Sequence, residues 1–359
     1  MLKLSAVCIA TMMLLQSPAS VAQTVPVAAG TSQAPLDAAS RAQLIDALIR
    51  ELNANYVFPD VAKKIEVGLR ERQQRGDYDR TADAKGLATL LTTDLQAISR
   101  DLHLGVRFSD TPAPPRPAGP RTPTPEDEAR FQARAKEMNY GLGKVEKLPG
   151  NIGYLETHGF GPVKYVDKAF AAAMTQLADT DALIIDMRGN GGGSPDSIAY
   201  LSSYLFDKRT HLNDLYWREG NRTEEFWTTE EVPGKKFGQQ KPVYVLTGPR
   251  SFSGAEEFSY NLQQLKRATL IGERTRGGAN PGGTLQLTPH FSVFVPRGRA
   301  INPISKINWE GTGVTPDVKV AAADALMTAQ KMALEKLAAD ERDPQKAQLL
   351  RARQAELGK

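Results

Sequence analysis

The chain has 359 residues, 41% hydrophobic and 24% charged, a composition typical of a globular protein with one large domain and a smaller one. The formal net charge is only +4, and no dense run of Lys and Arg is present, which argues against a nucleic acid partner. Cys8 is the only cysteine, which excludes an intramolecular disulfide and a site built from several thiolates.

Residues 1–22 are predicted to be a cleavable secretory signal peptide. Lys3 precedes an apolar run from Ala6 to Leu15, and Ser20-Val21-Ala22 places small residues before a cleavage site at Gln23. The apolar run is too short to span a membrane, and no later stretch is long and apolar enough for a transmembrane anchor. The sequence therefore predicts an exported protein, most simply periplasmic, whose mature form lacks cysteine.

The next residues predict a linker, a small helical domain and a tether. Residues 23–36 are small, polar and Pro-containing, as in a linker. Apolar residues then recur with a helical period in three segments, so residues 37–110 predict a helical bundle that ends in a strand edge at Asp101 to Phe108. Residues 111–149 begin with a proline-dense stretch and are expected to form a tether or surface arm.

An α/β domain is predicted over residues 150–320. Short apolar runs bounded by turn residues alternate there with amphipathic segments, which indicates strands alternating with helices. The strands are expected at 152–155, 182–187, 242–246 and 270–272, with helices at 164–177, 197–206 and 256–265 and a hairpin arm at 284–296. Residues 321–359 predict charged C-terminal helices.

Ser253 stands where one of these strands is followed by a helix. The first turn of a helix has unpaired N–H groups and the positive end of the helix dipole, which favour developing negative charge. A nucleophile whose attack creates an oxyanion suits that position. The alternative is that Ser253 only caps the helix, with Glu256 completing a capping box, and on this stretch alone capping is the commoner role.

A glycine-rich loop, residues 189–193, follows the strand at 182–187. Its exposed N–H groups are candidates for one half of an oxyanion hole, with Gly191 as the donor and the N–H of Gly254 as the other half. A tight turn is the plain alternative. A dinucleotide site is disfavoured because the candidate ribose-binding acid, Asp207, comes before any second strand, and the loop has no lysine for a phosphate loop.

One of the four histidines stands out as a general base. His103 lies in the strand-like stretch after the helical domain, beside Asp101, and His158 is the second choice, while the other two, His211 and His290, have polar surroundings. Glu310 lies among small residues in a turn-rich segment and by itself is a surface carboxylate. Together with a serine and a histidine, such an acid can orient the imidazole.

These pieces, in this order, resemble the tail-specific, or C-terminal processing, protease family of serine peptidases. The matching segments are Asp101-Leu102-His103, Gly153-Tyr154-Leu155, residues 186–192, residues 251–256, Gly272-Glu273-Arg274-Thr275 and residues 313–317. The resemblance covers roughly residues 44–320. The branch that the chain most resembles contains the tricorn core protease and the repeat modules of interphotoreceptor retinoid-binding protein.

The resemblance also indicates which catalytic residues to expect, because the two branches of the family differ in their general base. Gly278 stands where the processing proteases have their catalytic lysine, whereas the tricorn-like branch uses a histidine and a glutamate, roles that fall on His103 and Glu310. About fifty residues separate His103 from Gly153, too few for the PDZ domain of the processing proteases. The implied fold is a crotonase/ClpP-like α/β superhelix of ββα units with a small N-terminal helical bundle.

The resemblance implies a serine peptidase that acts on polypeptides without a cofactor or metal. His103 would take the Ser253 proton, Glu310 would orient the imidazole, and the N–H groups of Gly254 and Gly191 would bind the oxyanion. The alternative is a non-catalytic binder of apolar ligands or peptides on the same fold, as in the retinoid-binding modules. Acyl-CoA chemistry on the related crotonase fold suits an exported chain poorly. The sequence leaves the oligomeric state open.

Overall fold

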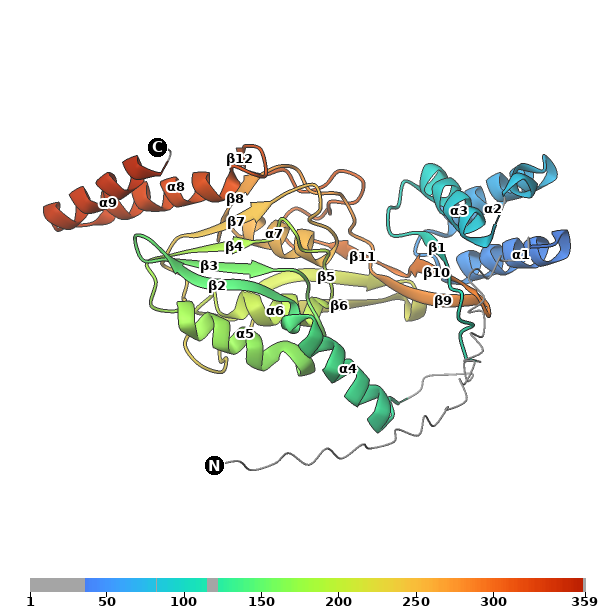
Figure 1. Ribbon diagram of the computed structural model, residues 1–359, viewed down its shortest axis with the longest axis horizontal. Helices are drawn as coiled ribbons and strands as arrows, with labels where there is room; N and C mark the ends of the chain where they lie inside the picture. Colours follow the sequence, from blue (N-terminus) through green and yellow to red (C-terminus); the bar gives the residue numbers. More distant parts are fainter. Residues whose placement is uncertain (1–35, 82, 115–121, 358–359) are drawn as a thin grey trace, which may run out of the picture. The chain divides into compact units, whose positions relative to one another are not determined.

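The structure is a computed structural model that describes residues 36–81, 83–114 and 122–357 (Figure 1). The predicted signal peptide, with Cys8, and the linker up to residue 35 lie outside the described residues. They stay predictions from the sequence.

A six-stranded sheet, in the order β12-β8-β7-β4-β3-β2, forms the centre of the α/β region. All neighbouring strands are parallel except β2, which is antiparallel to β3. The strands are β2 (Leu142–Leu148), β3 (Ile152–Thr157), β4 (Ala182–Asp186), β7 (Val243–Thr247), β8 (Thr269–Gly272) and β12 (Val318–Lys319). Every residue of β4 and β7 is buried, as expected for central strands covered on both faces.

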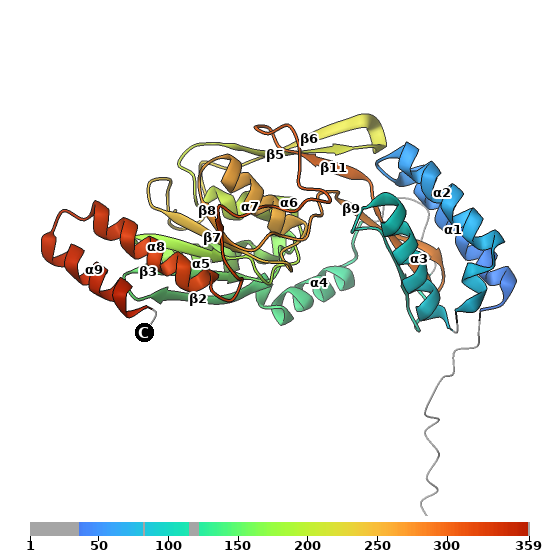
Figure 2. The same ribbon diagram turned by 90° about the horizontal axis from the view of Figure 1, so that it is seen from above.

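Helices cover both faces of this sheet (Figures 1 and 2). Alternate residues of β4 point to opposite faces: Leu183 packs with α5 (Val163–Leu177), α6 (Pro195–Ser203) and α7 (Gly254–Gln264), while Ile184 packs with α8 (Ala325–Asp340). The last helix, α9 (Pro344–Glu356), lies beside α8. Of the predicted C-terminal helices, α8 therefore packs on one face of the central sheet, and α9 packs against α8.

A second sheet, in the order β11-β5-β6, lies beside α7 and contributes to the same core as α5 and α6. It comprises β5 (His211–Trp217), β6 (Arg222–Trp227) and β11 (Gly298–Ile301). The sequence analysis did not predict these strands. The first four residues of β6 are exposed and polar, so Phe226 marks the buried side of that strand, as Leu212 and Leu215 do in β5.

The N-terminal helices share their core with strands from late in the chain. These are α1 (Ala38–Asn55), α2 (Pro59–Gln74) and α3 (Ala84–Ser99), and they pack on an antiparallel sheet of β1 (Gly105–Phe108), β10 (Phe291–Pro296) and β9 (Gly282–Thr288). Phe291, Val293 and Val295 of β10 belong to the same buried cluster as the helices. The helical region is therefore completed by the hairpin that the sequence predicted at 284–296.

Part of the range expected to be a tether, 111–149, is regular structure. Here α4 (Pro125–Glu137) begins at a proline, and Thr124 and Asp127 form a capping box before it. Proline at the first helical position is favourable because its missing N–H has no intrahelical partner there. The strand β2 also falls in this range and extends the central sheet. The proline-dense stretch thus ends where a helix starts.

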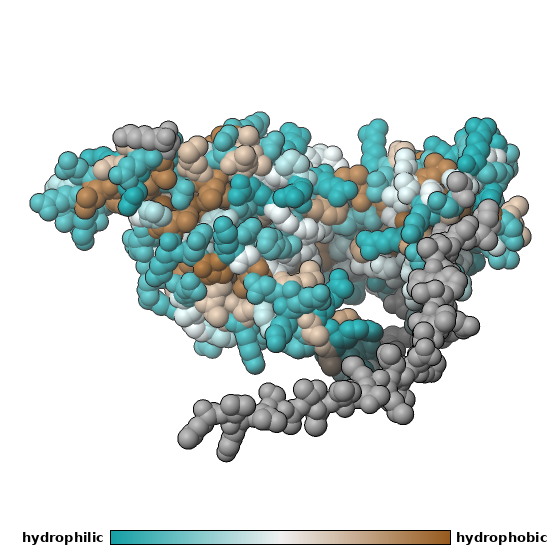
Figure 3. Space-filling model, viewed as in Figure 1, coloured by the Kyte–Doolittle hydropathy of each residue, from teal (hydrophilic) through white to brown (hydrophobic). Residues whose placement is uncertain are grey.

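Three short 3₁₀ helices complete the elements: Asp77–Arg80, Asn139–Gly141 and Glu219–Asn221. Hydrophilic residues predominate on the face drawn in Figure 3, with hydrophobic residues in separate areas. Within the described ranges, no helix combines the length and the apolar character needed to cross a bilayer. The architecture is a mixed α/β fold with an N-terminal helical region, in agreement with the predicted fold class.

Candidate active site

Ser253 occupies a strained turn between β7 and α7. Its φ is 54° and its ψ is −118°, a conformation that residues with a side chain rarely adopt. Such strain costs on the order of 1–3 kcal/mol and persists only where the surroundings enforce it. The Ser253 N–H donates to Glu256 Oε2 at 2.8 Å, and the preceding Phe252 N–H donates to the Asn190 carbonyl at 3.1 Å. These contacts hold the turn.

Glu256 ties the Ser253 turn to a second segment, residues 275–278. Its fully buried carboxylate accepts hydrogen bonds from the Gly278 N–H at 2.8 Å, the Gly277 N–H at 2.6 Å and the Thr275 hydroxyl at 2.5 Å. Burial raises the pKa of Glu256, whereas the hydrogen bonds favour its ionised form. From the sequence, Glu256 was predicted only as a capping residue, because the donors of residues 275–278 come close to it only in the folded chain.

The glycine loop packs directly against the Ser253 turn. Gly192 has a φ of +98°, and a Cβ added there would lie 2.5 Å from the Gly254 nitrogen and 2.9 Å from Ser253 Cβ. Only glycine fits so close an approach. The surface that the loop approaches is therefore the turn that carries the candidate nucleophile.

Two N–H groups beside Ser253 have no hydrogen-bond acceptor in the part of the chain that the structure describes: those of Gly193 and Gly254. A Cβ added to Gly254 would lie 2.9 Å from the Gly193 nitrogen, so the two groups are neighbours. The Gly191 N–H, by contrast, donates to the His158 carbonyl at 3.4 Å. The arrangement offers donors for an oxyanion next to the serine.

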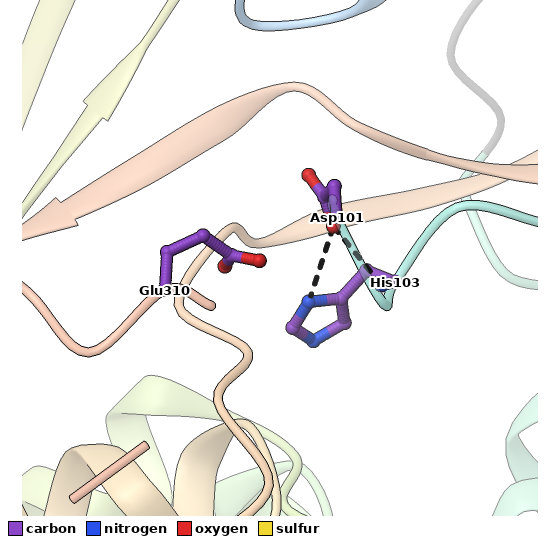
Figure 4. Close-up of side chains that lie close together, drawn as sticks. All are labelled: Asp101, His103 and Glu310. Atoms are coloured by element: carbon purple, nitrogen blue, oxygen red, sulfur yellow. Dashed lines mark hydrogen bonds and ion pairs between the residues drawn. The ribbon is translucent and has the colours of Figure 1, made fainter. Parts of the chain in front are cut away.

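His103 is anchored by Asp101 (Figure 4). Asp101 Oδ1 accepts the His103 backbone N–H at 3.0 Å and lies 3.9 Å from the ring nitrogen Nδ1. Asp101 is itself buried, and its Oδ2 accepts from the Tyr56 hydroxyl at 3.0 Å and from Asn280 Nδ2 at 2.9 Å. Asp101, which anchors the histidine, is thus itself held by the residue that follows α1 and by the segment before β9.

The imidazole lies beside two aromatic rings. Its centroid lies 4.5 Å from that of Phe252 and 5.8 Å from that of Phe294. A Cβ added to Gly278 would lie 2.6 Å from His103 Cε1 and 2.3 Å from Phe252 Cε2. The absence of a side chain at 278, where the processing proteases carry lysine, leaves the space that the histidine and phenylalanine rings occupy.

The environment keeps this histidine neutral. Neither ring nitrogen has a hydrogen-bond partner among the described residues. Burial, and secondly the positive charge of Arg276, lower the pKa of His103 to about 4. A neutral imidazole with free nitrogens can accept a proton at neutral pH.

Glu310 lies close to both His103 and Asp101. Its Oε2 accepts the Ala279 N–H at 2.5 Å, while its buried Oε1 has no partner within the described ranges. A carboxylate oxygen of Asp101, a ring nitrogen of His103 and a carboxylate oxygen of Glu310 all lie within 4.8 Å of one another. Burial, followed by the negative charge of Asp101, raises the pKa of Glu310, and burial also raises that of Asp101. The imidazole therefore faces two carboxyl groups that repel one another when both are ionised.

These three side chains are also the candidate metal-binding group among the described residues. Both oxygens of Asp101 already accept hydrogen bonds from the protein: Oδ1 from the His103 N–H, and Oδ2 from Tyr56 and Asn280. Glu310 Oε2 is likewise engaged by a backbone N–H. The arrangement suits the orientation of a histidine better than it suits the ligation of an ion.

A cavity of about 480 Å³ brings the candidate residues together. Ser253, His103, Gly254 and Gly191 all line it, and no hydrogen bond joins the serine to the histidine. Glu310 does not line it but lies within 4.8 Å of His103. The fold thus brings the predicted serine, histidine and loop glycines to one cavity, with the predicted acid next to the histidine.

The other candidate bases lie elsewhere. His158 is half exposed and 3.9 Å from Glu156, His211 pairs with Asp214 at 2.7 Å, and His290 contacts the Ser109 carbonyl at 2.9 Å. None of these three lines the cavity of Ser253. His103 is the one histidine that does.

Family models match most of the chain. The model of peptidase family S41 matches residues 151–320, and the model of the N-terminal domain of this family in eukaryotic IRBP matches residues 38–138. The chain is 25% identical over 191 residues to the carboxy-terminal-processing protease of Bartonella bacilliformis, covering 48% of this chain and 40% of the relative. It is 26% identical over 184 residues to the chloroplastic carboxyl-terminal-processing peptidase 1 of Arabidopsis thaliana, covering 51% and 36%.

Solved structures show the same fold. A lipoprotein from Streptococcus agalactiae superposes with a TM-score of 0.51 at 14% identity, covering 82% of this chain and 96% of the other. The tricorn protease superposes with a TM-score of 0.50 at 16% identity, covering 89% of this chain and 37% of the other. The chain spans at most 40% of the length of the two curated relatives named above. The two family models confirm the predicted resemblance: residues 151–320 match peptidase family S41, and residues 38–138 match the N-terminal domain of this family.

Proposed function

We propose that this protein is an exported serine peptidase that hydrolyses peptide bonds through an acyl-enzyme, with Ser253 as nucleophile, His103 as base and Glu310 as the acid that orients the imidazole. One observation carries the proposal: a strained serine at a helix start shares a cavity with a buried neutral imidazole and unpaired backbone N–H groups. A serine that only caps a helix needs none of these neighbours. The match of residues 151–320 to a peptidase family supports the same reaction.

In the proposed first step, Ser253 Oγ attacks the carbonyl carbon of the scissile bond while His103 accepts the hydroxyl proton. The same imidazole then donates that proton to the leaving amine, and water hydrolyses the acyl-enzyme by the reverse route. The Gly254 N–H stabilises the oxyanion. Of the loop glycines, Gly191 was the sequence prediction, but Gly193 has the N–H without an acceptor, so we propose Gly193 as the second donor.

The two carboxyl groups act when the imidazole becomes positively charged. Glu310 and Asp101 lie close to the ring, and the imidazolium that forms during attack favours the ionised form of both carboxyl groups, whose negative charge stabilises it in turn. Asp101 also holds the ring in place through the His103 backbone. Asp101 is thus a positioning residue that the sequence analysis left outside the predicted triad.

The polypeptide substrate and the export of the protein are parts of this proposal. The names of the curated relatives support a protease, and the sequence of residues 1–22 supports export. N-terminal sequencing of the secreted or periplasmic protein should begin at Gln23. A mature chain that still begins at Met1 would remove export from the proposal.

The test of the function compares wild type with Ser253→Ala on an unstructured protein substrate. We expect the wild type to cleave it and Ser253→Ala to lose activity, while circular dichroism shows the same fold. Ser109→Ala, at an exposed serine outside the cavity, is the matched control and should retain full activity. Equal turnover by Ser253→Ala would reject the nucleophile. A wild type that binds apolar ligands or peptides but cleaves nothing would favour the binder.

A further inference from the structure

We infer that the catalytic cavity selects a substrate with a basic side chain, lysine or arginine, beside the scissile bond, and that Glu257 recognises that side chain. This inference rests on the proposed peptidase function and names the substrate class of the same site.

Glu257 is placed to meet a substrate side chain next to the nucleophile. It follows Ser253 by four residues in the first turn of α7, so the two positions lie on one side of the helix. Both residues line the same cavity, together with Gly254. A substrate whose carbonyl lies at Ser253 therefore has its neighbouring side chain within the same cavity as the Glu257 carboxyl group.

The rest of the cavity suits the stem of a long basic side chain. Leu215, Trp217 and Phe226, from β5 and β6, form an apolar and aromatic part of its lining. Lysine and arginine pack their methylene groups on such surfaces and keep their charge at the far end, and their cations are attracted to aromatic faces. A cavity with apolar and aromatic walls and the carboxyl group of Glu257 therefore suits both the apolar stem and the charged end of such a side chain.

The charges around the cavity have one sign. Its lining contains three acids and, among the described residues, no lysine or arginine. Glu224 is already neutralised, since its Oε2 lies 3.2 Å from Arg222 Nη1 and accepts the Trp217 indole N–H at 3.0 Å. Asp196 is exposed. Glu257 is thus the buried acid of the cavity that lacks a cationic partner.

Glu257 also differs from its neighbour, Glu256, in the support that its carboxyl group receives from the fold. Glu256 is buried because four donors of the protein bind its carboxylate. Glu257 is 6% exposed, and no lysine, arginine or histidine pairs with it in the described part of the chain. A buried carboxyl group without a cation is costly to ionise.

The protonation of Glu257 agrees with this role. Burial raises the pKa of Glu257 to about 7; a hydrogen bond from the Asn213 side chain opposes that rise, and the charge of Asp196 adds a smaller contribution to it. A cation bound in the cavity would stabilise the ionised form and lower that pKa again. The cost of keeping an acid there is therefore offset only in the complex with a basic side chain.

The test uses full-length mature protein and two fluorogenic peptides that differ only in lysine or leucine before the scissile bond. We expect the wild type to prefer the lysine peptide. Glu257→Gln keeps the size and polarity of the side chain but removes its charge, and should lower kcat/KM for the lysine peptide at least about 30-fold while changing that for the leucine peptide by no more than about threefold.

Two further variants serve as comparisons. Glu224→Gln alters an acid of the same cavity that is already paired, so it should leave the lysine-to-leucine ratio unchanged. Glu257→Asp retracts the carboxylate and should shift the preference from lysine toward the longer arginine.

Should Glu257→Gln not fold, benzamidine, a small aromatic cation, provides the readout in the wild type. It should inhibit cleavage of the leucine peptide competitively.

The outcomes separate this inference from the proposed function. Cleavage of the leucine peptide in preference to the lysine peptide, or a Glu257→Gln variant with an unchanged ratio, would overturn the inference while leaving the peptidase intact. A large loss of preference in Glu224→Gln instead would overturn the assignment to Glu257. A wild type that cleaves neither peptide nor an unstructured protein would reject both.

Discussion

At the scale of single residues, the backbone of Ser253 offers a test of whether strain is maintained for function. Its positive φ is easy for glycine but strained for alanine and serine. We predict that Ser253→Gly is inactive yet more stable than Ser253→Ala, by about 1 kcal/mol in urea unfolding. Both variants lose the hydroxyl group, so the difference between their free energies of unfolding reports the backbone strain at this position. Equal stability of the two would mean that the turn is not strained.

The buried imidazole determines how activity responds to acid. An unperturbed histidine titrates near about 6.5, whereas the pKa of His103 is lowered to about 4. We therefore predict that protonation of His103 lowers kcat/KM only toward about pH 4, so that the pH profile has no acid limb near about 6.5 from this histidine. A profile measured on a small ester with an acid limb near 6.5 would contradict the proposed environment of the base.

The same shift affects stability. Below about pH 6.5 the unfolded chain protonates this histidine while the folded protein does not, so the free energy of unfolding decreases as the pH falls from about 6.5 toward the lowered pKa. His103→Phe keeps a buried ring but cannot bind a proton, and should lose less stability over that range. This comparison, by thermal unfolding, separates the histidine from other groups that titrate in acid.

Glu310 links activity and stability in opposite directions. Glu310→Gln removes the charge that would stabilise the imidazolium, and should lower kcat on the order of 10²- to 10⁴-fold with little change in KM. Because the pKa of Glu310 is raised in the folded protein, its carboxyl group destabilises the fold as the pH rises through that value. The variant should therefore unfold at a higher temperature than the wild type at pH 8–9. Full activity in Glu310→Gln would remove it from the site.

At the scale of elements, the central strands could be predicted because each is a run of buried apolar residues. β4 and β7 are buried at every position, and the sequence shows this directly. β2 and β6 are different, since each contains charged residues among few apolar ones, although each pairs with a strand that is its neighbour along the chain. The helix α4 was not predicted, because the proline-dense stretch before it indicated an irregular tether. Thr124 and Pro125 are nevertheless favourable residues for the start of a helix.

The segment 275–278 could not be connected with the nucleophile from the sequence. The carboxylate of Glu256 brings it beside Ser253, and Gly278 then leaves room for the rings of His103 and Phe252. We predict that Gly278→Ala displaces the imidazole and lowers kcat at least about 100-fold, because a shift of about 1 Å in a catalytic group is enough for that loss. Gly220→Ala, at a glycine far from the site with open space around it and a φ of +72°, is the control: backbone strain should lower its stability, while kcat stays unchanged. Unchanged kcat in Gly278→Ala would show that the ring is not confined there.

At the scale of the whole molecule, the site depends on contacts between distant parts of the chain. Asp101 bonds to Asn280, and β1 pairs with β10, so the N-terminal region reaches the site through residues near 280–296. The sequence indicated the histidine and the acid as separate motifs. Only the folded chain shows that they meet and that Tyr56 and Asp101 support the histidine.

This dependence predicts the effect of removing the helices. A variant that starts at Asp101 would expose Phe291, Val293 and Val295 and would lose the Tyr56 hydroxyl from Asp101. We expect it to aggregate or to hydrolyse small esters at a strongly reduced rate, measured beside size-exclusion chromatography. Ester hydrolysis at the full rate would show that the helices serve only to bind larger substrates.

The central claim is that His103 activates Ser253 in one cavity. The most direct measurement is labelling with a fluorophosphonate probe, followed by peptide mass spectrometry, in wild type, His103→Ala and His290→Ala. We expect one adduct, on Ser253, formed at the wild-type rate in His290→Ala and orders of magnitude more slowly in His103→Ala. An adduct on another serine, or labelling of Ser253 at an unchanged rate in His103→Ala, would contradict it.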